Sequence, residues 1–237
     1  MSFQAQSNDP SPEVIVFGGT FDPPHNGHAQ MVEAALNHFG AAEVIVVPAF
    51  APSAGGEGLK SVVASFPQRV EMARLAFAAT RRVKISTVEQ ELSTPSFTLN
   101  TLRFVSNQVA EKRLALLLGQ DQFEAFPKWH EPKAILNLAD LIIIPRPREM
   151  NRDSTLAKIA GEVAENLGTS LNWKHEGVIA TTQEGSNFYL LPAQVCQAVS
   201  SKIREQIKSG AATPPGWLTD SVRNYINKHQ LYRNNED

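Results

Sequence analysis

Cysteine is nearly absent from this sequence, which has Cys196 as its only cysteine in 237 residues. A single cysteine excludes a disulfide within the chain, and no group of cysteine and histidine residues has the spacing of a structural zinc site. Because nothing in the sequence depends on oxidation, we expect a cytoplasmic protein.

An excess of charge is also missing, since 22 lysine and arginine residues stand against 24 aspartate and glutamate residues, for a net charge of −2. Such a chain has no electrostatic footprint for nucleic acid or for an anionic membrane, so neither is an expected partner. Any phosphate ligand must then be bound by a local site, which suits a small nucleotide better than a polymer.

Long apolar runs are lacking as well. No segment reaches the length needed to cross a bilayer, and residues 1–13 are polar, so we expect a flexible leader there rather than a secretion signal. The sequence also has no Walker A lysine loop, no G-x-G-x-x-G turn and no H-E-x-x-H helix. Each of these absences removes one class of nucleotide-dependent or zinc-dependent enzyme.

Apolar runs alternate with segments of helical periodicity, and this alternation predicts a single α/β domain over residues 14–232 with a tail at 233–237. The expected fold is Rossmann-like, a doubly wound and mostly parallel sheet with helices on both faces. The segment at about 150–177 is expected to be a local insertion, with a charged helix over 150–168 and a loop to Gly177. The predicted strands are 14–17, 43–47, 83–86, 114–118, 141–144 and, at the sheet edge, 178–181 and 188–191. The main predicted helices are 29–39, 66–80, 132–138, 200–210 and 219–229.

The most informative stretch reads Gly-Gly-Thr-Phe-Asp-Pro-Pro-His-Asn-Gly-His over residues 18–28, between the first strand and the first helix. Gly18 and Gly19 have no Cβ, so a polyanion can approach the backbone, and the free N–H groups of the first helical turn point toward it. His25 and His28 lie three residues apart and project from one face of that turn, with Gly27 leaving room for a ligand. Each histidine taken alone is as typical of a surface; the assembled stretch predicts a phosphate site.

A second candidate anion site lies where the helix near residue 200 begins. Ser200 or Ser201 as the N-cap residue leaves backbone N–H groups facing outward, and Lys202 and Arg204 add cationic donors. An ordinary capped helix explains these residues equally well when they are considered without the histidines.

The stretch at residues 18–28 resembles the signature of the nucleotidylyltransferase superfamily, whose H-x-G-H motif is His25-Asn26-Gly27-His28 here. The full stretch is most similar to the bacterial nicotinate mononucleotide adenylyltransferases. The residues at 199–204 are similar to the superfamily's I-S-S-T-x-I-R motif, one residue shorter, and the resemblance extends from about Val14 to Tyr232. Phe97 and Asn100 depart from the family, which has a tyrosine and an aspartate at these positions.

The resemblance implies a role for many individual residues. The catalytic residues would be His25, His28 and Arg204. The ATP-binding residues would be Gly18, Gly19, Thr20, Phe21, His25, Gly27, His28, Gly119, Asp121, Ser200, Ser201 and Arg204. The mononucleotide-binding residues would be Thr20, Lys60, Thr98, Trp129, His130 and Arg146. No protein metal ligand is implied, because Mg²⁺ would be bound through the phosphates of ATP.

Some of these residues have a plain structural explanation beside the functional one. Taken alone, Lys60 is more typical of a solvated lysine and Trp129 of a core residue, while a helix N-cap explains Asp121 equally well. The family would use Trp129 to stack on the pyridine ring of its substrate. Ser96 is a plausible N-cap for the helix that follows it.

The reaction implied by the resemblance joins ATP and nicotinate mononucleotide to give deamido-NAD and pyrophosphate. Two alternatives remain from the sequence. A related adenylyltransferase using nicotinamide mononucleotide or phosphopantetheine would share the histidines and the serine motif, and a nucleotide sensor would bind ATP without releasing pyrophosphate. A homo-oligomer is compatible with either alternative.

Overall fold

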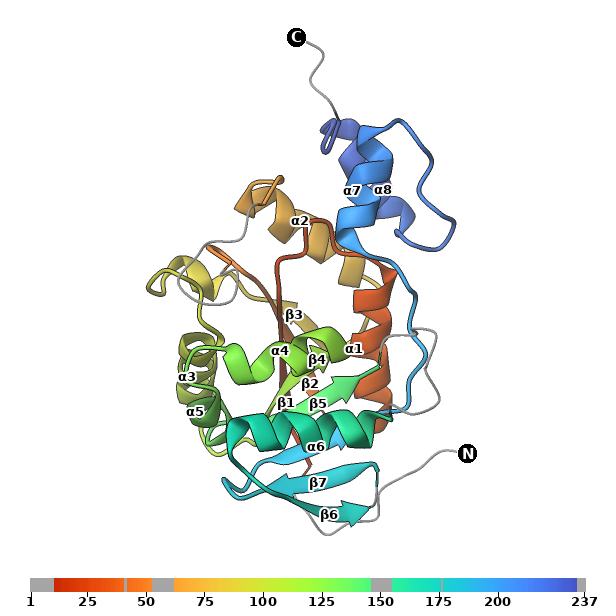
Figure 1. Ribbon diagram of the computed structural model, residues 1–237. Helices are drawn as coiled ribbons and strands as arrows, with labels where there is room; N and C mark the ends of the chain where they lie inside the picture. The colour runs from red at the N-terminus through yellow and green to blue at the C-terminus, as the bar shows by residue number, and fades with distance from the viewer. Residues whose placement is uncertain (1–10, 41, 53–61, 146–154, 176, 234–237) are drawn as a thin grey trace.

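The computed structural model describes residues 11–40, 42–52, 62–145, 155–175 and 177–233 (Figure 1). Within them the chain forms an eight-stranded sheet in the order β3-β2-β1-β4-β5-β8-β7-β6. Six neighbouring strands run parallel, namely β3, β2, β1, β4, β5 and β8, while β7 and β6 are antiparallel to their neighbours. The strands are β1 (Val14–Gly19), β2 (Glu43–Pro48), β3 (Val83–Ile85), β4 (Leu114–Gly119), β5 (Asp140–Ile144), β6 (Leu171–His175), β7 (Ile179–Thr182) and β8 (Asn187–Leu190). The predicted doubly wound, mostly parallel fold is confirmed.

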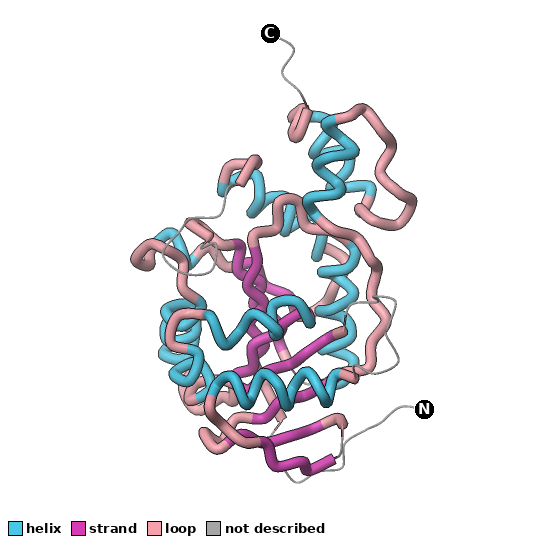
Figure 2. Tube along the Cα trace, in the orientation of Figure 1, coloured by secondary structure: helices cyan, strands magenta, loops and turns pink. Residues whose placement is uncertain are grey.

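Helices cover both faces of this sheet, as the tube in Figure 2 shows. The α-helices are α1 (Asn26–His38), α2 (Phe66–Phe77), α3 (Thr98–Gln108), α4 (Gln120–Ala125), α5 (Pro132–Leu136), α6 (Leu156–Leu167), α7 (Ser200–Lys208) and α8 (Asp220–Lys228), with short 3₁₀ turns at Val88–Gln90 and Phe126–Lys128. Each helix that the structure describes is too short or too polar to span a bilayer.

Alternate residues of the central strands supply two separate apolar cores. Ile15 and Phe17 of β1 face one core with α1, α2, α7 and α8, whereas Val14 and Val16 face the other with α3, α4, α5 and α6. Successive side chains of a strand point to opposite faces of the sheet, and parallel strands are buried on both. The uniformly apolar run at residues 14–17 therefore marks a central strand.

The order of the strands reverses at β1, because β2 and β3 lie on one side of it and β4 and β5 on the other. In open α/β sheets, ligands bind outside the carboxyl ends of the strands at such a switch point. The stretch at residues 18–28 leaves the sheet there, so the fold places it where a ligand is expected.

The region from about 150 to 191 differs from the prediction. The helix predicted over 150–168 begins at Leu156 within the described residues, and the predicted loop to Gly177 contains β6. The strand near residue 188 was predicted at the sheet edge, but β8 lies between β5 and β7, and all four of its residues are buried. Short apolar runs do not reveal strand direction, and here the chain turns back through an antiparallel hairpin.

Glu13, the last residue of the predicted leader, is hydrogen-bonded to the chain on both sides of β1. The Glu13 N–H donates to the Arg113 carbonyl at 2.9 Å, and the Glu13 carbonyl accepts the Glu43 N–H at 2.9 Å. Glu13 thus extends the pairing of β1 with its neighbours, and residues 1–10 of the leader lie outside the described residues.

Candidate active site

The two histidines of the motif stack on one another at the start of α1. His25 is the N-cap residue of the helix and is buried, while His28 is half-buried. Their ring centroids are 3.6 Å apart with an interplanar angle of 18°. The His25 N–H donates to His28 Nδ1 at 3.1 Å, so the ring proton of neutral His28 is on Nε2. His28 therefore offers an Nε2–H donor, and two imidazolium rings this close would repel each other.

Phe21 packs its ring against the His28 ring of this pair. Its own ring is buried and lies edge-on to His28, Phe17 and Phe77, with the His28 centroid 5.1 Å away. Its backbone has a φ of 51°, in the left-handed region. The side chain of Phe21 thus belongs to the core, and what it can offer a nucleotide is its backbone.

The three glycines of the motif have different surroundings. A Cβ on Gly18 would have no heavy atom within 4 Å, whereas one on Gly19 would lie 2.9 Å from the Phe21 ring. A Cβ on Gly27 would lie 2.7 Å from the Cys196 carbonyl oxygen and 3.1 Å from the His25 ring. The prediction that Gly27 leaves room for a ligand is wrong, because protein atoms fill that space. Of these three glycines, Gly18 is the one with open space where a Cβ would be.

The first turn of α1 is already engaged by the protein. The Asn26 N–H donates to the Trp217 carbonyl at 2.9 Å, and the Asn26 side chain donates to the Gly216 carbonyl at 2.7 Å. The His28 N–H returns to the His25 carbonyl at 2.9 Å. The prediction of free N–H groups here is wrong for Asn26 and His28, so an anion must rely more on side chains.

The serine motif packs directly against the histidine motif. The Ser200 hydroxyl donates to the Pro23 carbonyl at 2.9 Å, and the Arg204 guanidinium donates to the Asp22 carbonyl at 2.6 Å. The N-cap of α7 is Val199, not Ser200 or Ser201 as predicted, because Ser200 already has helical geometry and uses its hydroxyl for Pro23. Ser201 is exposed. Two motifs about 180 residues apart in sequence therefore meet at one loop.

A buried polar network lies beneath that loop, and sequence reasoning assigned it no role. The Asp22 carboxylate accepts the Val63 N–H at 2.8 Å, the Ala64 N–H at 3.1 Å and the Tyr232 hydroxyl at 2.8 Å. Arg69 donates to the Thr20 carbonyl at 2.7 Å and to the Ala64 carbonyl at 3.2 Å. Both Asp22 and Arg69 are buried, and these bonds fix the path of the chain from residue 20 to residue 24.

Burial changes the titration of two members of this network. Desolvation lowers the pKa of Arg69, and the nearby Asp22 carboxylate opposes that change. Desolvation, with the negative charge of Asp22, raises the pKa of Tyr232. Since arginine stays protonated in proteins, Arg69 remains a donor, and the Tyr232 hydroxyl keeps its proton over the physiological range.

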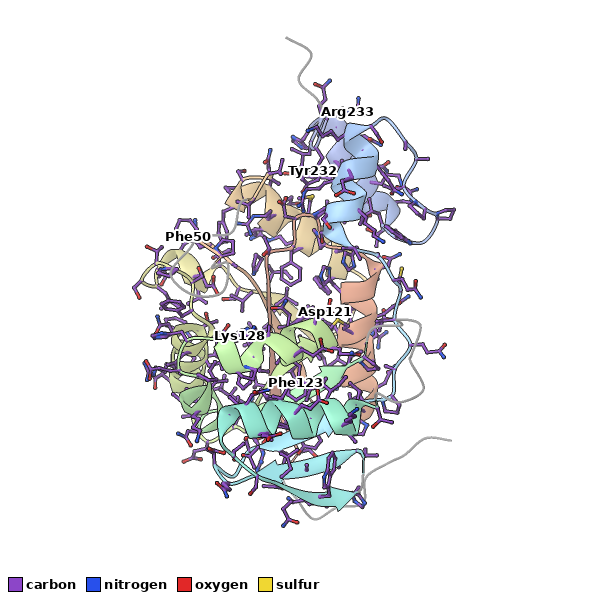
Figure 3. All side chains as sticks on the ribbon, viewed as in Figure 1. Phe50, Asp121, Phe123, Lys128, Tyr232 and Arg233 are labelled. Atoms are coloured by element: carbon purple, nitrogen blue, oxygen red, sulfur yellow. The ribbon has the colours of Figure 1, made fainter. Side chains whose placement is uncertain are left out.

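The carboxyl end of β4 reaches the same edge of the sheet. Gly119 is the N-cap residue of α4, so Asp121 lies in the first turn of that helix rather than at its cap. A Cβ on Gly119 would lie 3.7 Å from the Met31 side chain, so α4 begins beside the middle of α1. Figure 3 shows Asp121 on the part of α4 nearest α1.

A separate aromatic group lies across the strand ends. His130 stacks on Phe97, with ring centroids 4.2 Å apart and an interplanar angle of 17°, and its Nε2 lies 3.1 Å from a Glu131 carboxylate oxygen. The half-buried Trp129 contacts Phe126 edge-on at 5.5 Å. Thr98 is the first residue of α3, directly after Phe97. The stacking on Phe97 thus places His130, with Trp129 before it in the chain, next to the start of α3, where Thr98 lies.

Two predictions for residues near this group are not confirmed: one concerns the N-cap of α3 and the other the cationic residues of the mononucleotide site. The N-cap of α3 is Phe97, whereas the Ser96 hydroxyl accepts the Ala51 N–H at 3.0 Å and so binds the loop after β2. Lys60 and Arg146, the two cationic residues expected to bind the mononucleotide, lie outside the described residues.

A buried carboxylate that sequence reasoning missed holds the loop after β2 against α3. Glu89 accepts the Phe50 N–H at 2.9 Å and the Thr101 hydroxyl at 3.0 Å. Phe50, labelled in Figure 3, rests edge-on against Phe66 at 5.1 Å and keeps 38% of its surface exposed. No motif distinguishes Glu89 from the other acidic residues of its segment, so only the fold reveals it.

Comparison with known proteins adds independent information. Residues 16–206 match the model of the cytidylyltransferase-like family. A probable nicotinate-nucleotide adenylyltransferase of Gloeobacter violaceus is 31% identical over 221 residues, covering 92% of this chain and 94% of the relative. A probable nicotinate-nucleotide adenylyltransferase of Dechloromonas aromatica is 32% identical over 221 residues, covering 92% and 97%.

The fold is similar to that of solved structures. The nicotinic acid mononucleotide adenylyltransferase of Plasmodium falciparum complexed with NaAD superposes with a TM-score of 0.66 at 16% identity, over 94% of this chain and 98% of that one. A putative nicotinate-nucleotide adenylyltransferase of Vibrio parahaemolyticus gives a TM-score of 0.59, also at 16% identity, over 94% and 97% of the two chains.

Proposed function

The chain belongs to the nicotinate-nucleotide adenylyltransferase family, and from this premise we propose that it joins ATP and nicotinate mononucleotide to give deamido-NAD and pyrophosphate in the biosynthesis of NAD. The observation that carries the proposal is the convergence of the His25–His28 pair and the Ser200–Arg204 pair on the loop beyond β1. The single cysteine supports the cytoplasm as its compartment.

The chemistry requires no protein nucleophile. An oxygen of the mononucleotide 5′-phosphate attacks the α-phosphorus of ATP, a new P–O bond forms, and the bond to the bridging oxygen breaks to release pyrophosphate. The attacking phosphate is already an anion at neutral pH, so a general base adds little. The protein must instead align two anions and stabilise the charge that develops on the leaving group.

The residues that do this are set in place before ATP arrives. We assign His25 and His28 to the α- and β-phosphates, since their stacked rings are fixed by a backbone hydrogen bond and by Phe21. We assign Arg204, with the start of α7, to the β- and γ-phosphates. Donors that need no rearrangement give the largest electrostatic stabilisation of a transition state.

Magnesium is proposed to enter with ATP. The described residues include no group of three or more histidine, cysteine, aspartate or glutamate side chains able to hold a metal ion. Mg²⁺ usually binds through substrate phosphates with one or two carboxylates, and when bound it neutralises charge on the phosphate oxygens. We assign Asp121 to orienting metal-bound phosphates or to the ribose hydroxyls.

The acceptor is proposed to bind near Trp129 and His130, with Thr98, Lys60, Arg146 and Thr20 around its phosphate and ribose. An indole can stack on nicotinate and nicotinamide alike, so charge must provide the selection. The Trp129 N–H donates to the Phe126 carbonyl at 3.0 Å, so the backbone N–H groups after it would have to satisfy the carboxylate, while an amide would present its own N–H to one of them. An unpaired buried donor costs about 1 to 3 kcal/mol, which corresponds to a preference of roughly 10- to 100-fold.

This preference is tested by pyrophosphate release from ATP with each acceptor at saturating ATP. We expect kcat/KM for nicotinate mononucleotide to exceed that for nicotinamide mononucleotide by about 10- to 100-fold. Trp129→Ala should raise the KM of the acceptor far more than that of ATP. Equal efficiency would overturn the acceptor assignment, greater activity with phosphopantetheine would identify a related adenylyltransferase, and ATP binding without pyrophosphate release would identify a sensor.

Arg204→Ala is expected to weaken ATP and to leave the acceptor unaffected. A lost charge-assisted hydrogen bond to the triphosphate costs about 1.5 to 3 kcal/mol, or roughly a 10- to 150-fold rise in the dissociation constant. Calorimetric titration with a non-hydrolysable ATP analogue measures this. Lys208→Ala is the matched control, since Lys208 is an exposed cation in the last turn of α7, away from the start of the helix. Unchanged ATP binding with loss of the acceptor would place α7 on the other substrate.

A further inference from the structure

The side chain of Tyr232 reaches back from the end of the last helix into the loop that carries the histidine motif. Its hydroxyl donates to Asp22 Oδ1 at 2.8 Å and lies 3.9 Å from the Met72 sulfur. Only 6% of Tyr232 is exposed, and its φ of 65° places its backbone in the left-handed region, which a bulky residue rarely adopts. The residue whose hydroxyl meets Asp22 therefore has an unfavourable backbone conformation.

Asp22 connects this tyrosine to the proposed phosphate-binding side chains. It lies three residues before His25, and its carbonyl accepts a hydrogen bond from Arg204. Its carboxylate, which can only accept, is occupied by the Tyr232 hydroxyl and by the N–H groups of Val63 and Ala64. The Asp22 carbonyl thus binds Arg204, while the Asp22 carboxylate binds Tyr232 and the backbone of Val63 and Ala64.

The distance between Arg204 and the carboxylate is the critical detail. Arg204 lies 3.9 Å from Asp22 Oδ2, so the two charges form an ion pair without a hydrogen bond, while the hydrogen bond from Arg204 to the Asp22 carbonyl is 2.6 Å long. The Val63 N–H occupies Oδ2, and the Ala64 N–H and the Tyr232 hydroxyl occupy Oδ1. A carboxylate that lost one donor would be drawn toward Arg204 and would compete with the phosphates for that charge.

We propose that Tyr232 is a positioning residue that acts through Asp22: its hydroxyl keeps the carboxylate from closing the 3.9 Å ion pair with Arg204 into a hydrogen-bonded one, and so leaves the guanidinium available to the triphosphate. This inference rests on the proposed function, in which Arg204 binds ATP. Burial raises the pKa of the Tyr232 hydroxyl, so it remains a donor at every pH at which the enzyme would work. The role concerns ATP, because Arg204 is assigned to the β- and γ-phosphates and the acceptor ring to the group around Trp129 and His130.

Tyr232→Phe tests the proposal, because it removes the hydroxyl and keeps the ring. We expect kcat/KM for ATP to fall about tenfold, in line with loss of one hydrogen bond to a charged group, while the KM of nicotinate mononucleotide is unchanged. The matched control is Tyr189→Phe. Tyr189 is also buried with a hydrogen-bonded hydroxyl, but it packs on Phe39, one length of α1 or roughly 20 Å from His25.

The Arg204→Ala background separates the possible outcomes. If the hydroxyl acts through Arg204, Tyr232→Phe has no further effect on ATP in that background. A Tyr232→Phe enzyme with a lower melting temperature but the kinetic constants of the Tyr189→Phe control would overturn the inference and show a purely structural contact. Should Arg204→Ala itself leave ATP unaffected, the phosphate assignment of Arg204 fails, and the inference fails with it.

Discussion

Replacing His28 with alanine is expected to lower the turnover number by roughly 100-fold or more, and His25→Ala is expected to do the same. Each ring is already held in place by the fold, since the two rings stack at 3.6 Å and the His25 backbone N–H donates to His28 Nδ1 at 3.1 Å. The effect should appear mainly in kcat, because charge on the α- and β-phosphates grows as the leaving pyrophosphate separates. Steady-state pyrophosphate release at saturating ATP and acceptor measures it.

The structure supplies a control for this pair on the same helix. His38 is in the last turn of α1, where burial lowers its pKa, and it packs edge-on against Phe39. His38→Ala should leave the turnover unchanged. His28→Gln, which returns an N–H donor near the place of Nε2, should recover part of the lost activity. Near-normal turnover in both His25→Ala and His28→Ala would leave the histidines with a structural role only.

The fold of the first 50 residues could be predicted from the sequence because local and long-range preferences agree there. The short β-branched run at residues 14–17 is typical of a buried strand, and the helical periodicity that follows within a few residues favours a parallel sheet. The rule that ligands gather at the carboxyl ends of such strands then located the site without any knowledge of contacts. The same reasoning failed for β8, because a four-residue apolar run does not reveal whether its partner is parallel or antiparallel.

The supports of the site could not be predicted, because their partners are distant in sequence. Asp22 and Tyr232 are separated by 210 positions, and no periodicity or spacing links them. Glu89 meets Phe50 across 39 positions and is one of three acidic or amide residues in a row. Sequence reasoning found the side chains that would face a ligand, whereas the buried groups that hold them depend on how the whole chain packs.

The glycines of the motif show most clearly that packing partners distant in sequence could not be predicted. Gly18 and Gly27 look alike in the motif, and both were expected to leave space for a ligand. In the structure only Gly18 has open space, while Gly27 lets the segment through Cys196 pass close to the start of α1. Gly18 therefore leaves space that a ligand could occupy, whereas Gly27 serves packing, and substitutions should separate these two roles.

Gly27→Ala is expected to lower both stability and turnover. A Cβ at Gly27 would lie 2.7 Å from the Cys196 carbonyl oxygen, which is backbone and can yield only if its segment shifts. Such overpacking costs about 1 to 3 kcal/mol, enough to lower the melting temperature by several degrees. The same Cβ would lie 3.1 Å from the His25 ring, and displacing a catalytic group by about 1 Å can reduce the rate roughly 100-fold.

Substitutions at two other glycines are compared with Gly27→Ala. The quantities compared are the melting temperature, measured by calorimetry, and the steady-state kinetic constants. Gly161 is exposed within α6, and a Cβ there would meet nothing within 4 Å, so Gly161→Ala should raise stability by about 0.5 to 1 kcal/mol through helix propensity alone. Gly18→Ala should leave the melting temperature unchanged and raise the KM of ATP, because the added methyl group would occupy space that the triphosphate needs. A stabilised and fully active Gly27→Ala enzyme would show that the Cys196 segment yields freely, and the position of His25 would then not depend on that glycine.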